Sequence, residues 1–198
     1  YETGLAGTDP AFFEMFTFPF LKGNPKTALE GKLSVVITEK MAQKYFGSED
    51  PMGKMLNFNG RTDFQVTGVL ENIPKNSHLQ FDFVLPFHLL ENLGQDIHNW
   101  GNFNFFSYVL LDKTISVESA SQKISGYLKT IRPEDDTQLF IQPLGRIHLH
   151  SDFEYDALAG NKGDHKYVFI FASIALFVLF IACINFINLT TARSRNRA

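Results

Sequence analysis

The longest apolar run of the chain lies near its C-terminus. Residues 167–184 contain one clearly polar side chain, Ser173. Apolar side chains would surround a helix formed by this run, a pattern typical of helices that face lipid. Continued to residue 189, such a helix would be about 34 Å long, enough to cross a hydrocarbon core of about 30 Å. We therefore predict a transmembrane helix over residues 167–189.

Short apolar runs and amphipathic spacings fill the first half of the chain. Asp9 and Pro10 resemble an N-cap and a first-turn proline, and they are followed by phenylalanines on one side of a short helix. Residues 33–37 form a β-branched run of strand length, and Thr38 then caps a predicted helix that ends at Gly47. The apolar positions of these two helices are Phe12, Phe13 and Phe16, then Met41, Ala42, Tyr45 and Phe46.

Residues 54–70 change to a period of two. Leu56 and Phe58 precede the turn pair Asn59-Gly60, and Phe64 and Val66 alternate with polar positions after it. An Asn-Gly pair between two alternating segments predicts a β-hairpin.

Residues 105–144 predict the order strand, helix, strand. Residues 105–111 and 138–144 have strand-like composition, and Ser116 can cap a helix between them. The apolar positions of that helix are Val117, Ala120, Ile124, Leu128 and Ile131. This order predicts a βαβ unit packed as a two-layer sandwich, and hence an α+β chain.

Charge and cysteine content narrow the class of protein. Three of the 18 Lys and Arg residues follow the apolar run, and none of the 21 Asp and Glu residues do, so the preceding part is acidic. An acidic domain without a cluster of basic residues argues against nucleic-acid binding. The chain has a single cysteine, Cys183, which lies inside the apolar run. Because there is no second cysteine, a disulfide within the chain is excluded. The 21 phenylalanines indicate a substantial aromatic core or an apolar contact surface.

The sequence contains no strong pattern for catalysis or for a cofactor. It has neither a GxxxxGK[ST] phosphate-binding loop nor a GxSxG nucleophile pattern. His148, His150 and Asp152 alternate and would share one face of an extended segment, but a metal site needs a further strong ligand placed elsewhere. The acidic residues 134–136 follow Pro133 and have the pattern of a solvated turn. We therefore expect a protein that is not an enzyme and has no bound metal or cofactor.

Small and polar residues inside the apolar run predict contacts with other helices. Ala172, Ala175 and Ala182 form a narrow stripe along which a second backbone can approach closely. Asn185 and Asn188 are expected to hydrogen-bond to a neighbouring helix, because an asparagine that faces lipid is costly.

Three segments resemble one family of membrane proteins. They are VVITEKMAQKYFGSEDPMGKML (residues 35–56), FQVTGVLENIPKNSHLQFDF (64–83) and IACINFINLTTARSRNRA (181–198). Together they resemble the extracytoplasmic core domain and second transmembrane helix of MacB-like and FtsX-like ABC transporter permeases. The resemblance covers nearly the whole chain.

The resemblance implies a two-lobed domain outside the cytoplasm, followed by one transmembrane helix. Residues 1–31 and 99–160 would form a membrane-proximal βαβ-type lobe, and residues 32–98 an inserted mixed α/β lobe that contains the hairpin. Residues 190–198 would begin a cytoplasmic segment anchored by three arginines: Arg193, Arg195 and Arg197. The small excess of positive charge after the run agrees with this orientation. The chain would then be a fragment, with the first transmembrane helix and the later ones lying outside it.

The resemblance also implies partners. A cytoplasmic ABC ATPase on a separate chain would hydrolyse ATP, the permease would dimerise in the bacterial inner membrane, and the outer domain would engage cargo or a periplasmic or outer-membrane protein. An alternative is an extracytoplasmic sensor domain of a membrane-bound signalling receptor, because such receptors also place a domain before a membrane helix.

Overall fold

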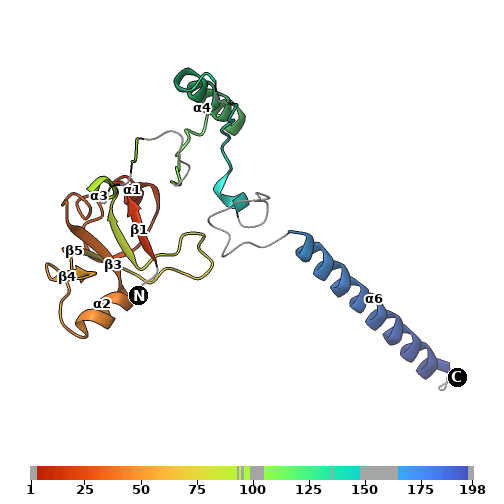
Figure 1. Cartoon of the computed structure of the whole chain (residues 1–198). Coiled ribbons are helices and arrows are strands. Elements are labelled where there is room, and N and C mark those ends of the chain that lie inside the picture. The colour runs from red at the N-terminus through yellow and green to blue at the C-terminus, as the bar shows by residue number, and fades with distance from the viewer. Residues whose placement is uncertain are drawn as a thin grey trace. The chain divides into compact units, whose positions relative to one another are not determined.

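The computed structural model describes residues 4–92, 94, 96–98, 105–134, 136–147 and 165–195. The chain forms two compact units, unit 1 with residues 1–112 and unit 2 with residues 113–198. Figure 1 shows the elements of both units, most of them labelled.

Unit 1 is built on a mixed six-stranded sheet. Its strands are β1 (Leu5–Thr8), β2 (Phe20–Gly23), β3 (Ser34–Thr38), β4 (Met55–Phe58), β5 (Thr62–Leu70) and β6 (Phe83–Pro86). The order is β1-β6-β3-β5-β2, and β4 pairs separately with β5. Two pairs, β1 with β6 and β3 with β5, are parallel, and the other pairs are antiparallel.

Side chains cover both faces of this sheet. All five residues of β3 are buried, so the strand lies between two apolar layers. Val35 and Ile37 contribute to one layer, which contains Met41 of the second helix. Val36 contributes to the opposite layer, which is rich in phenylalanine. The alternation along β3 thus divides the core between the two faces of the sheet.

The predicted helices of unit 1 are present, but the N-terminal hydrogen bonding of both helices differs from the prediction. Helix α1 (Phe12–Met15) has Ala11 at its N-cap, so the prediction that Asp9 caps it is wrong. Asp9 instead accepts a hydrogen bond from the Phe12 N–H through its backbone carbonyl, at 3.2 Å. A further short helix, α3 (Leu89–Asn92), follows β6.

Helix α2 (Glu39–Phe46) begins after Thr38 and ends at Gly47, as predicted. The Thr38 hydroxyl bonds to Asp82 rather than to the helix. The exposed helix N–H of Lys40 instead donates to the side-chain carbonyl of Asn72, at 2.9 Å. A residue far along the chain therefore caps α2, which ties the segment after β5 to the start of the helix.

The predicted hairpin is confirmed. Strands β4 and β5 are antiparallel, with Leu56 opposite Phe64 and Phe58 opposite Thr62. Asn59 and Gly60 both have positive φ, 55° and 68°, the backbone conformation that an Asn-Gly hairpin turn requires.

Unit 2 contains the two predicted longer helices. Helix α4 (Val117–Ile131) has Ser116 at its N-cap, and the Ser116 side chain accepts from the Ser119 N–H at 3.1 Å. A short 3-10 turn, η1, covers Leu144–Arg146. Helix α6 (His165–Arg195) contains the whole predicted transmembrane range.

The two strands predicted around α4 are wrong, and the described residues of that region do not form a βαβ unit. Along residues 105–111 the partly buried positions are every third residue, 105, 108 and 111, whereas a half-buried strand has a period of two. In residues 138–144, the N–H groups of Leu139 and Ile141 bond to serine hydroxyls of α4. The mixed α+β class itself is confirmed by the sheet of unit 1 and by the helices.

The structure groups the first residues differently from the expected lobes. Strands β1 and β2 lie within residues 1–31, but they pair with β6 and β5 of the range 32–98. Both strands are too short to give an apolar period of their own, so their place in the sheet is decided by their partners. Which part of the domain lies nearer to the membrane remains a prediction.

Candidate functional site

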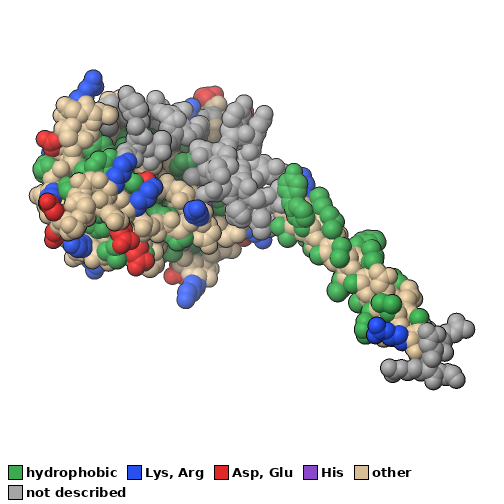
Figure 2. Space-filling view, turned by 90° about the horizontal axis from the view of Figure 1, so that it is seen from below, with side chains coloured by type: hydrophobic (Ala, Val, Ile, Leu, Met, Phe, Trp, Pro, Cys, Tyr) green, Lys and Arg blue, Asp and Glu red, His purple; other side chains and the backbone are tan. Residues whose placement is uncertain are grey.

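Helix α6 has the length and composition of a membrane span over His165–Arg193. Figure 2 shows hydrophobic side chains along its visible face. Hydroxyl groups of three of its residues, Ser173, Thr190 and Thr191, bond to its own backbone: Ser173 donates to the Phe169 carbonyl at 2.8 Å, and Thr191 donates to the Ile187 carbonyl at 2.8 Å. These bonds satisfy polar groups that would otherwise be exposed to hydrocarbon.

The residues predicted to contact other helices lie on different faces of α6. At about 100° per residue, Ala172, Ala175 and Ala182 fall within about 80° of one another. Asn185 lies about 90° from the centre of this alanine stripe, and Asn188 about 150° from it. The alanines and Asn188 therefore cannot contact the same neighbouring helix, and their contacts remain predictions.

The basic end of the helix includes Arg193 and Arg195. Arg197, the third arginine of the predicted cytoplasmic anchor, lies outside the described residues. Positive charge at this end of the helix agrees with a cytoplasmic location of that end under the positive-inside rule.

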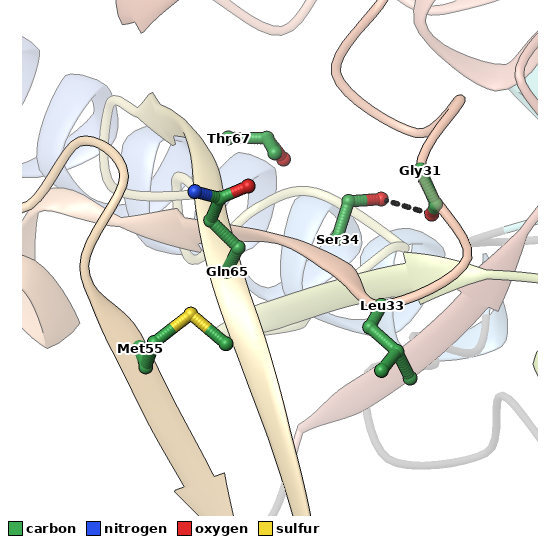
Figure 3. A pocket seen from close by; sticks show the side chains of 6 residues that line it. All are labelled: Gly31, Leu33, Ser34, Met55, Gln65 and Thr67. Atoms are coloured by element: carbon green, nitrogen blue, oxygen red, sulfur yellow. Dashed lines mark hydrogen bonds between the residues drawn. The ribbon is translucent and has the colours of Figure 1, made fainter.

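Unit 1 has a shallow pocket of about 300 Å³ beside the starts of β3 and β4 and the middle of β5. Figure 3 shows its six lining residues, which are Gly31, Leu33, Ser34, Met55, Gln65 and Thr67. The hydroxyls of Ser34 and Thr67 are engaged, donating to the carbonyls of Gly31 at 2.7 Å and of Ala28 at 2.6 Å. No ionisable side chain is among these six residues, so the pocket offers an apolar surface rather than acid or base groups.

Residues 105–112, here called the connector, form the last segment of unit 1. Phe105 packs against Phe87, with ring centroids 5.2 Å apart. Tyr108 packs against Phe16 at 5.0 Å and against His78 at 5.8 Å, both edge to face. Two aromatic side chains three residues apart therefore hold the connector against the sheet unit.

His78 is the titratable group of this aromatic contact. Its Nε2 atom is buried and has no hydrogen-bond partner. Burial lowers the pKa of the His78 imidazole, because the charged form loses solvation without gaining a partner. This cluster could not be predicted from the sequence, because Phe16, His78 and Tyr108 come from three distant segments.

Only some of the residues considered for metal binding or catalysis are among those that the structure describes. His148, His150 and Asp152 lie outside the described residues, as does Asp135. Glu134 and Asp136 are exposed, as expected for a solvated turn. Among the residues that the structure describes, no three His, Cys, Asp or Glu side chains form a group that could hold a metal ion.

Known proteins resemble this chain in sequence and in fold. A domain assigned to a permease protein of Porphyromonas gingivalis is 25% identical, with a TM-score of 0.58, over 72% of this chain and 67% of that one. The extracellular domain of the noncanonic ABC-type transporter YknZ from Gram-positive bacteria is 19% identical, with a TM-score of 0.51, over 72% of this chain and 74% of that one. This second likeness concerns the fold alone. Among curated proteins no match was found.

The family comparison covers most of the chain. Residues 1–127 match the model of the MacB-like periplasmic core domain. This range includes the whole sheet of unit 1 and most of α4. The chain therefore belongs to the family of MacB-like periplasmic core domains, which are extracytoplasmic domains of ABC transporter permeases, and α6 is its candidate membrane anchor.

Proposed function

We propose that this chain is the part of an ABC transporter permease that engages cargo or a partner protein outside the cytoplasm, and that α6 couples this domain to an ATPase on a separate cytoplasmic chain. The observation that carries the proposal is the family match over residues 1–127 followed by a candidate membrane span at His165–Arg193. The family match favours a permease over the alternative of a signalling receptor.

Continuity of α6 supports a mechanical role. The helix runs without interruption from His165 to Arg195 and contains neither glycine nor proline. A helix of this length spans about 46 Å and resists sharp bending where such residues are absent. A displacement applied to one end of α6 would therefore be transmitted along it as the movement of one rigid rod.

Coupling also needs contact with other membrane helices. The alanine stripe of Ala172, Ala175 and Ala182 is the face of α6 where another backbone can approach closely. The side chain of Asn188 projects from the other side, where its amide can donate to and accept from a second neighbour. Two such faces fit a helix placed between neighbours, as in a dimer of permease subunits.

Added bulk on the alanine stripe tests this role. In the complete permease, reconstituted with its ATPase in proteoliposomes, Ala175→Leu and Ala182→Leu should lower transport by roughly tenfold or more, because each leucine separates packed helices. ATP hydrolysis should continue, since the ATPase is not altered.

Ile187→Phe is the control for added bulk. Ile187 lies about 100° both from the centre of the alanine stripe and from Asn188, so it is on neither of the two proposed contact faces. Transport should change little in this variant. If added bulk is tolerated equally at Ala175, Ala182 and Ile187, α6 is an anchor that does not transmit motion.

A further inference from the structure

Aromatic side chains attach the connector to unit 1. Phe105 and Tyr108 point toward the sheet unit, while Phe106, Val109 and Leu110 are exposed, Leu110 to 81%. No residue of the connector belongs to a helix or strand. Its position therefore depends on side-chain contacts, among them those of the Tyr108 ring with Phe16 and His78.

The loop that carries His78 is fixed by its own hydrogen bonds. The Gln80 side-chain amide donates to the carbonyls of Pro74 and Ser77, at 2.8 and 3.0 Å. The Ser77 hydroxyl accepts from the Leu79 N–H at 3.3 Å. Because these bonds lie on both sides of His78, the imidazole is held against the rings of Phe16 and Tyr108.

The surroundings of the imidazole suit its neutral form. Its Nε2 atom is buried without an acceptor, so a proton added there would have no hydrogen-bond partner. The titratable groups on the elements around it are Glu14 of α1, Lys75 of its own loop, and Tyr108 and Asp112 of the connector. None of them is a cause of the pKa shift of His78, which is due to burial alone.

We propose that protonation of His78 releases the connector from unit 1, so that the attachment between the sheet and the segment leading to α4 depends on pH. A charged imidazole needs water or an acceptor, and it gains water if Tyr108 moves away from it. The contact lies within unit 1 and does not depend on the proposed coupling to an ATPase.

The direction of the pH dependence follows from the lowered pKa. The docked state holds His78 neutral, whereas the released state lets it titrate near its ordinary value of about 6.5. The docked state therefore has its full stability above that value and loses stability as the pH falls through it toward the lowered pKa.

A spin label on the connector can measure this release. The label is placed at Leu110→Cys in a Cys183→Ala background, in the 198-residue chain in lipid nanodiscs. Between about pH 7.5 and about pH 5, the mobile fraction in the electron paramagnetic resonance spectrum should rise at least about twofold. An unchanged mobile fraction would overturn the proposal.

Two variants assign the response to His78. His78→Phe keeps an aromatic ring without a titrating nitrogen, so the mobile fraction should no longer depend on pH. His98→Phe removes an exposed histidine of another loop and should leave the pH response intact. A pH response that persists in His78→Phe would contradict the proposal.

A measurement on the unaltered residue covers the case in which His78→Phe does not fold. The imidazole of His78 can be titrated by nuclear magnetic resonance in the same chain carrying isotope-labelled histidine. Its midpoint should coincide with the midpoint of the mobility change. Midpoints that clearly differ would show that another group controls the connector.

Discussion

Central strand β3 of unit 1 and helix α4 of unit 2 are held by contacts of different kinds. Val36 of β3 lies opposite Gly68 of β5 on one side and Val84 of β6 on the other, and the whole strand is buried. In α4, Ala120 and Leu128 are the buried residues. The segment of residues 138–144, which lies beside α4, is joined to α4 by the hydroxyls of Ser121 and Ser125.

The two regions should therefore open in different ways. Removing β3 would break two strand pairs and both apolar layers at once, so unit 1 should unfold cooperatively. The segment beside α4 depends on a few hydrogen bonds to side chains, so it should open locally at lower free energy. Mutations in the two regions should therefore differ in how far their effects spread.

The largest effect is expected from Ile37→Asp. Ile37 is completely buried in β3, and a carboxylate there would lack a partner, which costs more than about 4 kcal/mol of unfolding free energy. Hydrogen exchange should show loss of protection throughout the sheet, while the amides of α4 keep theirs. Leu33→Asp, at an exposed position just before β3, should cost less than about 1 kcal/mol. Equal loss of protection in α4 would contradict the independence of the two regions.

A smaller effect is expected from removing both serine hydroxyls of α4. Ser125 accepts from the Leu139 N–H at 3.0 Å and also donates to the Leu139 carbonyl, and Ser121 accepts from the Ile141 N–H at 2.9 Å. The double variant Ser121→Ala and Ser125→Ala should destabilise this attachment by about 2 kcal/mol, and the amides of Leu139 and Ile141 should exchange faster.

Thr130→Ala is the control for the serine variant. The Thr130 hydroxyl bonds to the Tyr127 carbonyl of its own helix, so its loss should not alter exchange at Leu139 or Ile141. Protection that survives in the double serine variant would mean that other contacts hold the segment.

The smallest effects are expected from the helix caps, which differ between the two regions. Ser116→Ala removes the local cap of α4, and Asn72→Ala removes the distant cap of α2; each should cost about 1 kcal/mol. Ser116→Ala should increase exchange in the first turn of α4 alone. Asn72→Ala should affect the start of α2 and also the segment after β5, because one bond joins them. If both variants affect their own first turn alone, the distant cap has no role in joining the two segments.

Elements with strong local patterns could be predicted from the sequence. Three elements could be recognised from neighbouring residues alone: the Asn59-Gly60 turn, helix α4 after Ser116 and the apolar run of α6. Such elements depend on side-chain spacing and turn chemistry, which neighbouring residues determine.

Elements that depend on distant partners could not be predicted. Residues 105–111 have the composition of a strand, but the rings of Phe105 and Tyr108 are both engaged with unit 1, and this three-residue spacing is incompatible with a half-buried strand. Strand β1 was missed for the converse reason, because its four residues become a strand by pairing with β6. The contact of His78 with Tyr108 likewise requires the fold before it can be recognised.

The pairing of β1 with β6 sets an order of assembly. Leu5 lies opposite Phe83, so β1 leaves a ribosome or a translocation channel well before its partner β6, the last of the described strands of the sheet. The hairpin of β4 and β5 needs only a short loop closure and can form much earlier. Until β6 emerges, β1 must remain unpaired. The pairing of β1 then completes the edge of the sheet in one of the slowest steps of folding, when nearly all of unit 1 has been delivered across the membrane.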